Sequence, residues 1–283
     1  MPMPAKISLI HTISGFKGPV YALAGFYAGG ADGYLVRWDA ETGTGLACAQ
    51  FPSAIFALHE QGDQVWIGTF SGQLYRYRPG SGVEEMLRCG SAIYAIQSTG
   101  QSLWVGCKSG HLWTWDGENT WQSQAVLPGA LRHLNVHRGE MWYGGSGGSW
   151  GPLEGSQCPV VHQGTISGLA MAPDRVVSSG MDAKLCLWNP SADMGWVCQQ
   201  EIPAHLQGIH ALALQPLQSV LLTGSLDKSI KVWDFATLTL LKVMDPSKGE
   251  MAHTRSVNAL QWLDDERFVS VSDDATLKLW RWA

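Results

Sequence analysis

Two short motifs have the residue types and spacing of chemical sites. Gly144-Gly-Ser146-Gly-Gly148 fits the G-x-S-x-G pattern, in which a serine on a tight strand-to-helix turn attacks a carbonyl carbon. His133 and His137 are spaced like the two histidines that bind zinc from one face of a helix. The serine nucleophile and the zinc site therefore each require a helix where their motif lies, so the surrounding sequence must favour a helix there.

Neither position has the helix that its chemistry needs. The glycines around Ser146 predict a hairpin between two strands. His133 and His137 lie on an expected strand, where side chains four residues apart are separated by about 13 Å. The glutamate of the zinc motif is also missing, and the six cysteines contain no C-x-x-C pair, which indicates reduced structural thiols. We therefore expect a protein that is not an enzyme, with no catalytic residue, no metal site and no cofactor.

One apolar phrase recurs along the chain and shows which elements are present instead. Its successive copies start 35 to 48 residues apart, close to the repeat of a four-stranded propeller blade. The copies are Val20-Tyr-Ala-Leu23, Ile55-Phe-Ala-Leu58, Ile93-Tyr-Ala-Ile96, Leu131-Arg-His-Leu134, Ile166-Ser-Gly-Leu169, Ile209-His-Ala-Leu212 and Val257-Asn-Ala-Leu260.

A turn and a further strand follow most copies of the phrase. In six of them a Gly, Asp or Ser turn is followed six residues later by an aromatic residue, as from Asp32 to Trp38 and from Asp227 to Trp233. Such turns between β-branched and aromatic residues are typical of hairpins. No 3.6-residue helical pattern competes with them, so we predict an all-β chain.

The segment Ser225-Leu-Asp-Lys-Ser-Ile-Lys-Val-Trp-Asp234 resembles the WD-repeat (WD40) family, and the resemblance extends over essentially the whole chain. It implies a hydrogen-bonded set in each blade: a histidine before the first strand, a Ser or Thr in the second, an aspartate in the turn and a tryptophan in the third. Three repeats have all four residues: His162, Ser178, Asp182 and Trp188; His205, Thr223, Asp227 and Trp233; and His253, Ser270, Asp274 and Trp280.

The first four repeats depart from this pattern. Phe16 stands at the histidine position of the first repeat and Ala28 at its serine position. The second strands of repeats two to four carry Trp66, Trp104 and Trp142 instead. We expect apolar packing to replace the polar set in this half of the chain.

The predicted fold is a single seven-bladed propeller spanning residues 1–283. Its repeats start near residues 16, 51, 89, 127, 162, 205 and 253, and the fourth, around Ser146, is the least regular. The last repeat ends after its third strand, so we expect residues 7–13 to supply the outer strand of blade 7, which protects that edge from pairing with other chains. The compact layout resembles small single-domain bacterial WD-repeat proteins.

Composition excludes several classes of partner. The chain is 45% hydrophobic, is 15% charged and carries a net charge of −5. It has no block of Lys or Arg for nucleic acid and no run of 18 apolar residues for a membrane. The first residues lack the apolar core of a signal peptide. We therefore expect a cytoplasmic protein, monomeric on its own, that binds neither nucleic acid nor membranes.

The resemblance also implies a binding face. In the family, the residue before the turn aspartate projects from one face of the ring near the central opening. Phe70, Met181 and Leu226 would form an apolar group there, beside Lys108 and Asp273. We predict these five as binding residues. A second group, Tyr21, Phe56 and Tyr94, recurs one place into the first strand, and we expect it to pack between blades.

The function that fits these features is a non-catalytic protein interaction scaffold, whose partners are other proteins or peptides. One alternative is a small-molecule-binding propeller enzyme, which would need convergent polar or metal-binding residues over the central opening. Another is a substrate-recruiting adaptor of a ubiquitin ligase. The WD-x-Arg pattern of some such receptors is absent from Trp38-Asp-Ala-Glu41 and from Trp233-Asp-Phe-Ala236.

Overall fold

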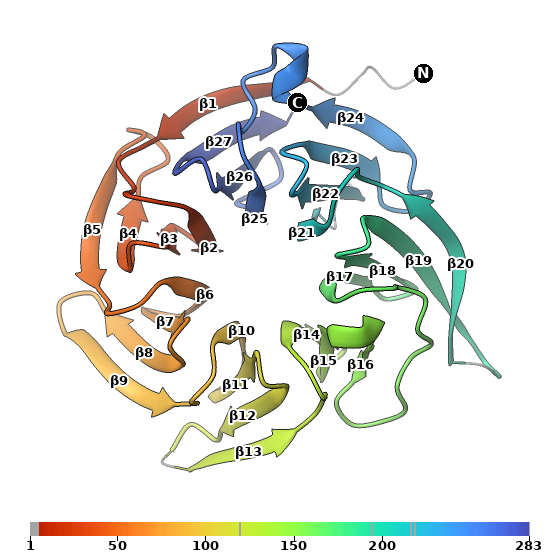
Figure 1. The fold of residues 1–283 in the computed structure, drawn as a ribbon, viewed down its shortest axis with the longest axis horizontal. Coiled ribbons are helices and arrows are strands. Elements are labelled where there is room, and N and C mark those ends of the chain that lie inside the picture. The colour runs from red at the N-terminus through yellow and green to blue at the C-terminus, as the bar shows by residue number, and fades with distance from the viewer. Residues whose placement is uncertain (1–5, 119, 194, 216, 218, 283) are drawn as a thin grey trace.

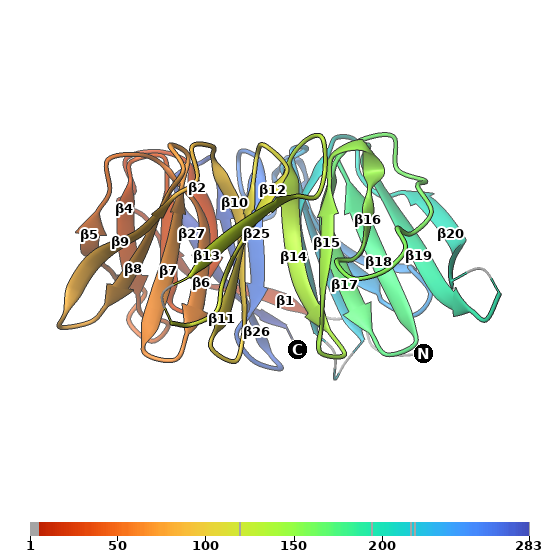
Figure 2. The ribbon, with the colours of Figure 1, turned by 90° about the horizontal axis from the view of Figure 1, so that it is seen from below.

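A computed structural model describes residues 6–118, 120–193, 195–215, 217 and 219–282. These residues form seven antiparallel sheets arranged as blades around a central axis (Figure 1). In each blade the strand that carries the recurring apolar phrase lies nearest the axis. Seen edge-on, the strands run from one face of the ring to the other, with loops on both faces (Figure 2). The all-β, seven-bladed prediction is therefore confirmed.

Blade 1 contains β2 (Val20–Ala24), β3 (Tyr27–Gly30), β4 (Tyr34–Trp38) and β5 (Gly45–Gln50). Blade 2 contains β6 (Ile55–Gln61), β7 (Gln64–Thr69), β8 (Gln73–Arg78) and β9 (Gly82–Arg88). Blade 3 contains β10 (Ile93–Thr99), β11 (Ser102–Cys107), β12 (His111–Trp115) and β13 (Trp121–Ala125). Blade 4 contains β14 (Leu131–His137), β15 (Glu140–Gly145) and β16 (Trp150–Pro152).

Blade 5 contains β17 (Ile166–Ala172), β18 (Arg175–Gly180), β19 (Lys184–Ser191) and β20 (Gly195–Pro203). Blade 6 contains β21 (Ile209–Gln215), β22 (Val220–Ser225), β23 (Ile230–Asp234) and β24 (Leu240–Met244). Blade 7 contains β25 (Val257–Trp262), β26 (Arg267–Ser272), β27 (Leu277–Trp282) and β1 (Ile7–Ile13). Two short 3-10 turns, η1 (Ser146–Gly148) and η2 (Pro246–Lys248), lie between strands.

The ring closes through the N-terminal strand, as predicted. β1 pairs antiparallel with β27, from Ile7 opposite Trp282 to Ile13 opposite Leu277. It covers the outer edge of a blade whose other three strands come from the C-terminal end of the described chain (Figure 1). This pairing satisfies backbone groups that would otherwise be open to another chain.

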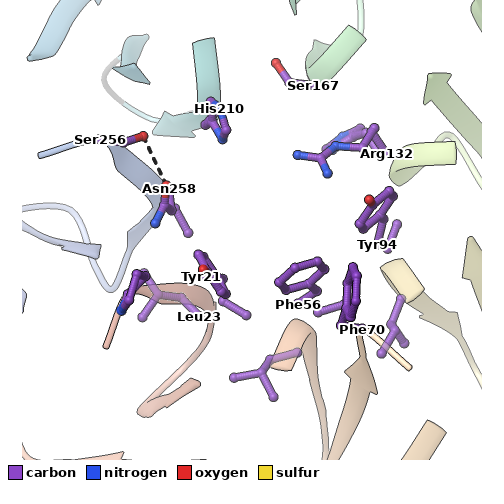
Figure 3. A pocket seen from close by; sticks show the side chains of 18 of the residues that line it. Tyr21, Leu23, Phe56, Phe70, Tyr94, Arg132, Ser167, His210, Ser256 and Asn258 are labelled. Atoms are coloured by element: carbon purple, nitrogen blue, oxygen red, sulfur yellow. Dashed lines mark hydrogen bonds between the residues drawn. The ribbon is translucent and has the colours of Figure 1, made fainter. Parts of the chain in front are cut away.

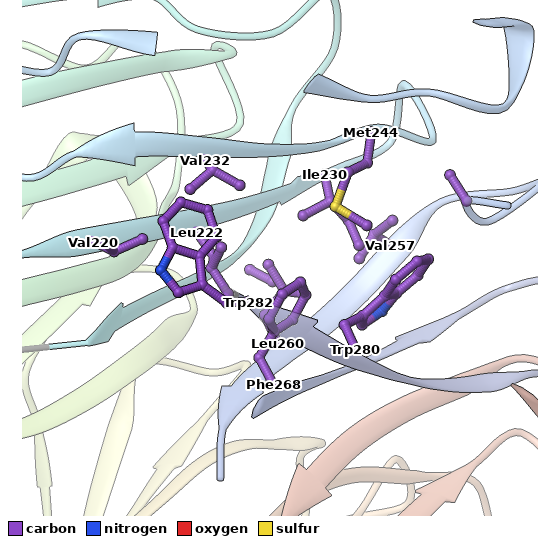
Figure 4. Packing of buried hydrophobic residues seen from close by; sticks show 12 residues of the cluster. Val220, Leu222, Ile230, Val232, Met244, Val257, Leu260, Phe268, Trp280 and Trp282 are labelled. Atoms are coloured by element: carbon purple, nitrogen blue, oxygen red, sulfur yellow. The ribbon is translucent and has the colours of Figure 1, made fainter. Parts of the chain in front are cut away.

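The hydrophobic core is divided into layers between neighbouring blades. In the layer between blades 6 and 7, Leu222 and Val232 face Val257 and Phe268, and all four side chains are fully buried (Figure 4). Burying each aliphatic side chain contributes roughly 1.5–3 kcal/mol. Equivalent layers lie between the other pairs of neighbours. This packing holds the inner strands, and the turns beside them, at fixed positions around the axis.

Candidate binding site at the channel mouth

All seven inner strands are irregular at the same place. Each inner strand pairs with the second strand of its blade. The register of this pairing shifts between the first and third residues of the recurring apolar phrase, as between Val20 and Ala22. The second residue is left out of the ladder, and such a bulge turns its side chain to a new direction. We call these residues the bulge ring; they are Tyr21, Phe56, Tyr94, Arg132, Ser167, His210 and Asn258.

The bulge ring lines a cavity of about 710 Å³ on the axis of the propeller. The cavity opens at the face where the chain enters each inner strand, which we call the top face. Turns between the second and third strands lie on the same face and add Phe70, Leu226 and Asp273 to the lining. Every blade thus contributes at least one side chain to a single concave site, and all seven members of the bulge ring are partly buried.

The side of the cavity formed by blades 1 to 3 is aromatic. The ring of Phe56 lies 5.0 Å from that of Tyr21, 5.3 Å from that of Phe70 and 5.8 Å from that of Tyr94. The first two pairs meet edge to face and the third is stacked, which are the favoured arrangements of aromatic rings. We call these four residues the aromatic wall (Figure 3).

Arg132 of blade 4 continues the aromatic wall with a positive charge. Its guanidinium carbon lies 4.4 Å from the centre of the Tyr94 ring, and the group points into the cavity (Figure 3). Burial lowers the pKa of Arg132 below its usual value, although a guanidinium stays protonated at neutral pH. No ion pair found among the described residues includes Arg132.

Polar side chains from blades 5 to 7 complete the cavity. Asn258 donates through Nδ2 to Asp273 Oδ1 at 2.7 Å and to the carbonyl of Val20 at 2.8 Å. The hydroxyl of Ser167 donates to the Ile209 carbonyl. His210 Nε2 is buried and has no hydrogen-bond partner within the described part of the chain. Burial lowers the pKa of His210, Arg132 lowers it further, and Asp273 opposes the shift, so the imidazole is neutral at pH 7.

The predicted four-residue sets lie outside the cavity, inside blades 5 to 7. In blade 6, Trp233 Nε1 donates to Thr223 Oγ1 at 2.9 Å, and the same hydroxyl lies 2.7 Å from His205 Nε2. The other imidazole nitrogen lies 3.0 Å from Asp227 Oδ2. The sets of blade 5 (His162, Ser178, Asp182, Trp188) and blade 7 (His253, Ser270, Asp274, Trp280) have the same connections.

The aspartates of these sets are held as carboxylates. Burial alone would raise the pKa of Asp182, Asp227 and Asp274, but hydrogen bonds from their histidines and from backbone N–H groups outweigh it and lower the pKa of all three. Each set is a closed chain of donors and acceptors within one blade. We therefore assign the sets a structural role.

Comparison with known proteins identifies the repeat. Residues 196–234 and 246–281 match the profile of the WD domain, G-beta repeat. The fold matches the crystal structure of the WD40 β-propeller domain of Doa1 with a TM-score of 0.85 at 11% identity, over 98% of this chain and 97% of that one. The chain is a seven-bladed β-propeller in which residues 196–234 and 246–281 are WD40 repeats.

Sequence relatives of this chain match it only in part. A ribosome biogenesis protein WDR12 homolog of Drosophila persimilis is 30% identical over 117 residues, which are 38% of this chain and 28% of that protein. The 66 kDa stress protein of Physarum polycephalum is 27% identical over 42% of this chain and 19% of its own length. Protein HIR1 of Eremothecium gossypii is 29% identical over 43% of this chain and 16% of its own length. The chain thus matches less than a third of each relative.

The structure separates the five residues predicted to bind partners. Phe70, Leu226 and Asp273 line the central cavity of the propeller. Lys108 lies beside Phe70 in a neighbouring depression with Ser91 and Ala92. Met181 packs against the backbone at Gly208, in the loop that enters the next blade, and is 36% exposed. The cavity and these flanking residues share the top face but form separate features.

Tyr21, Phe56 and Tyr94 were expected to pack between blades, and their rings do contact one another across neighbouring blades. The bulges also turn these side chains toward the cavity, which they line. Sequence reasoning also missed Arg132 and His210 as cavity residues. Their common position, the second of the recurring phrase, was the signal that could have found them.

The motifs considered for catalysis and metal binding have structural surroundings. Ser146 lies in η1, between strands β15 and β16, rather than between a strand and an α-helix. Within the described ranges no group of three or more His, Cys, Asp or Glu side chains could hold a metal ion. No helix among the same residues is long and apolar enough to cross a membrane.

Proposed function

We propose that this WD40 propeller is a non-catalytic protein-interaction platform whose binding surface is the channel mouth and the adjoining turns of the top face. The observation that carries the proposal is the cavity itself, which gathers side chains from all seven blades into one concave site. Two exposed apolar side chains, Phe70 and Met181, at 52% and 36% exposure, lie on the same face. Apolar side chains beside polar ones are typical of the centres of protein interfaces.

The rigidity of the ring supports the same function. The loops of the top face are anchored by packed layers between blades and, in blades 5 to 7, by the hydrogen-bonded sets. A partner that touches several loops therefore meets a surface whose parts are already at their bound positions, which lowers the entropic cost of binding. The proposal keeps the cytoplasmic location and the monomeric state expected from the sequence.

The test is affinity purification of the tagged full chain from its native host, followed by quantitative mass spectrometry. We expect one or more specific partners, and we expect their recovery to fall at least about tenfold for a variant carrying Phe70→Glu, Met181→Glu and Leu226→Glu. A buried charge without a partner at an interface costs enough binding free energy for such a loss.

A matched variant on the outer strands controls for general effects of added charge. Leu46 on β5 and Val83 on β9 are 71% and 46% exposed, away from the cavity lining. A variant carrying Leu46→Glu and Val83→Glu should retain the same partners. Equal loss from both variants, no loss from either, or no partner above the background of untagged cells would each reject the top face as the binding surface.

A further inference from the structure

Arg132 is the most unusual charge in the cavity. Its guanidinium is partly buried, points into the open space, and has no carboxylate partner among the described residues. Removing a charge from water is unfavourable unless an opposite charge compensates for it. Arg132 stacks on Tyr94, and its hydrogen bond to the Tyr94 side chain engages only part of the five N–H groups of the guanidinium. An anionic ligand would compensate for the charge and accept from the other N–H groups.

The other charges of the cavity define what kind of anion fits. Asp273 lies across the mouth, where Asn258 holds its carboxylate at 2.7 Å, and His210 between them is neutral. One guanidinium facing one aspartate suits a single carboxylate rather than a chain of phosphates. The net charge of −5 further disfavours a polyanion.

The aromatic wall indicates which kind of group lies next to that carboxylate in the ligand. Tyr94 has Arg132 over its ring. The Phe56 ring stacks on Tyr94 at 5.8 Å between ring centres, and the Phe70 ring meets Phe56 edge to face at 5.3 Å. Aromatic walls often attract cations, but Arg132 already occupies the face of Tyr94 and would repel a second positive charge. The free apolar surface of Phe56 and Phe70 instead suits an aromatic or aliphatic side chain.

We propose that the channel mouth binds a peptide segment in which an Asp or Glu lies within two residues of an aromatic or large aliphatic residue. Arg132 binds the carboxylate through charge-assisted hydrogen bonds, and the aromatic wall packs against the apolar side chain. This inference rests on the proposed function, because it names the kind of partner that the platform takes at its centre.

The experiment is selection of random octapeptides displayed on phage against the immobilised full chain. We expect enrichment of peptides that carry Asp or Glu within two positions of Phe, Tyr, Trp, Leu or Ile. Against the Arg132→Gln variant, the apolar residue should persist while the acidic residue is no longer enriched. Arg37→Gln removes a positive charge from an exposed position on strand β4, outside the cavity lining, and should select the same peptides as the wild type.

Binding of a synthetic copy of the most enriched peptide then tests the interaction between Arg132 and the acidic residue of the peptide. Its affinity for the wild type should fall about tenfold or more when its acidic residue is replaced by the amide, because a charge-assisted hydrogen bond is lost. The same replacement should change little against Arg132→Gln, since the two changes remove one interaction. A circular dichroism melt of each variant checks that the ring is intact.

Several results would overturn the inference. They are enrichment of basic peptides, no enrichment of any peptide, or an equal effect of Arg37→Gln and Arg132→Gln. The two proposals fail separately. If host partners depend on the top face but the selection yields no acidic motif, the platform remains and the peptide class is wrong. If the acidic motif is selected but the top-face variant keeps its host partners, the platform surface is wrong.

Discussion

A single hydrogen-bonded set shows how a buried carboxylate can be kept in a propeller blade. In blade 6 the donors run from Trp233 through Thr223 and His205 to Asp227, whose side chain is only 8% exposed. Asp227 also accepts the backbone N–H groups of Leu206 and Ser229. The aspartate therefore joins the loop before the blade to its own turn and completes the hydrogen bonds of its histidine.

We expect Asp227→Ala to lower the free energy of unfolding by about 1–3 kcal/mol, because it leaves His205 and two backbone donors without their acceptor. Urea unfolding followed by fluorescence measures the change. Asp32→Ala is the matched control. Asp32 is the corresponding turn residue of blade 1, where it accepts backbone N–H groups from Lys17 and Tyr34 but faces no histidine. An equal loss in the two variants would show that the histidine adds nothing.

The hydrogen-bonded sets and the bulge ring show what sequence can and cannot predict. The members of the sets could be located in advance because each position requires one chemistry, so that a histidine and an aspartate recur at fixed spacing. The bulge ring could not, because a bulge places no requirement on the side chain. Tyr21, Arg132, Ser167 and His210 share a position and a direction but no chemical property. Their place in the cavity becomes visible only when the strand register is known.

At the scale of elements, β1 determines whether the ring is closed. It is the outermost strand of blade 7, and its loss would open the whole length of β27. We expect deletion of residues 1–13 to give an aggregating or unfolded product, because an open strand edge pairs with other chains. Size-exclusion chromatography and thermal melting measure this. Deletion of residues 1–6 leaves β1 in place and should give a monomer with a cooperative melt. A soluble, cooperative protein lacking residues 1–13 would contradict this account of closure.

Blade 4 is held by tryptophans rather than by a fourth strand. Its described residues form three strands, and Trp150 on β16 is fully buried against Trp142 and Trp188. Trp150 Nε1 also donates to the Pro159 carbonyl, which ties down the loop running where an outer strand would lie. The sequence around Ser146 indicated the least regular of the seven repeats. The packing that replaces the strand depends on contacts with blade 5, which no repeat pattern reveals.

We expect Trp150→Ala to lower the free energy of unfolding by about 3–5 kcal/mol, because it leaves a large cavity between blades 4 and 5. Trp121→Ala is the comparison. Trp121 lies on the outer strand β13 of blade 3 and is only partly buried, so a smaller loss is expected. Chemical denaturation measures both. A loss for Trp150→Ala no greater than that for Trp121→Ala would show that blade 4 does not depend on this side chain.

At the scale of the whole molecule, the ring divides into two chemically different parts. Blades 5 to 7 carry the hydrogen-bonded sets and the polar side of the cavity, whereas blades 1 to 3 carry the aromatic wall. Arg132 lies at the border between them, on blade 4. A regular repeat therefore builds an asymmetric site. The side chain at the bulge position can differ from blade to blade, whereas the residues packed between blades must stay apolar.

We expect histidines with lowered pKa values to make the stability of the entire ring sensitive to mild acid. His59 bonds Ser98 of the next blade at 2.7 Å, and burial lowers the pKa of His59 to about 4. Burial likewise lowers the pKa of His133 to about 4, and that of His205 is also lowered. A histidine whose pKa is lower when folded binds fewer protons than it does in the unfolded chain. Its contribution is complete above the unfolded value of about 6.5 and is lost as the pH falls toward the folded value.

We therefore expect the free energy of unfolding to fall between pH 7 and pH 5, by on the order of 1–2 kcal/mol for each histidine of this kind. This interval separates histidines from carboxylates: the low pKa values of Asp227 and Asp274 reduce stability only below about pH 4. Urea unfolding at the two pH values makes the measurement. His59→Gln can keep a hydrogen bond to Ser98 but cannot take up a proton, so its stability should fall less between pH 7 and pH 5 than that of the wild type. If the wild type is equally stable at both values, or if His59→Gln falls just as much, burial of His59 is not what links the ring to pH.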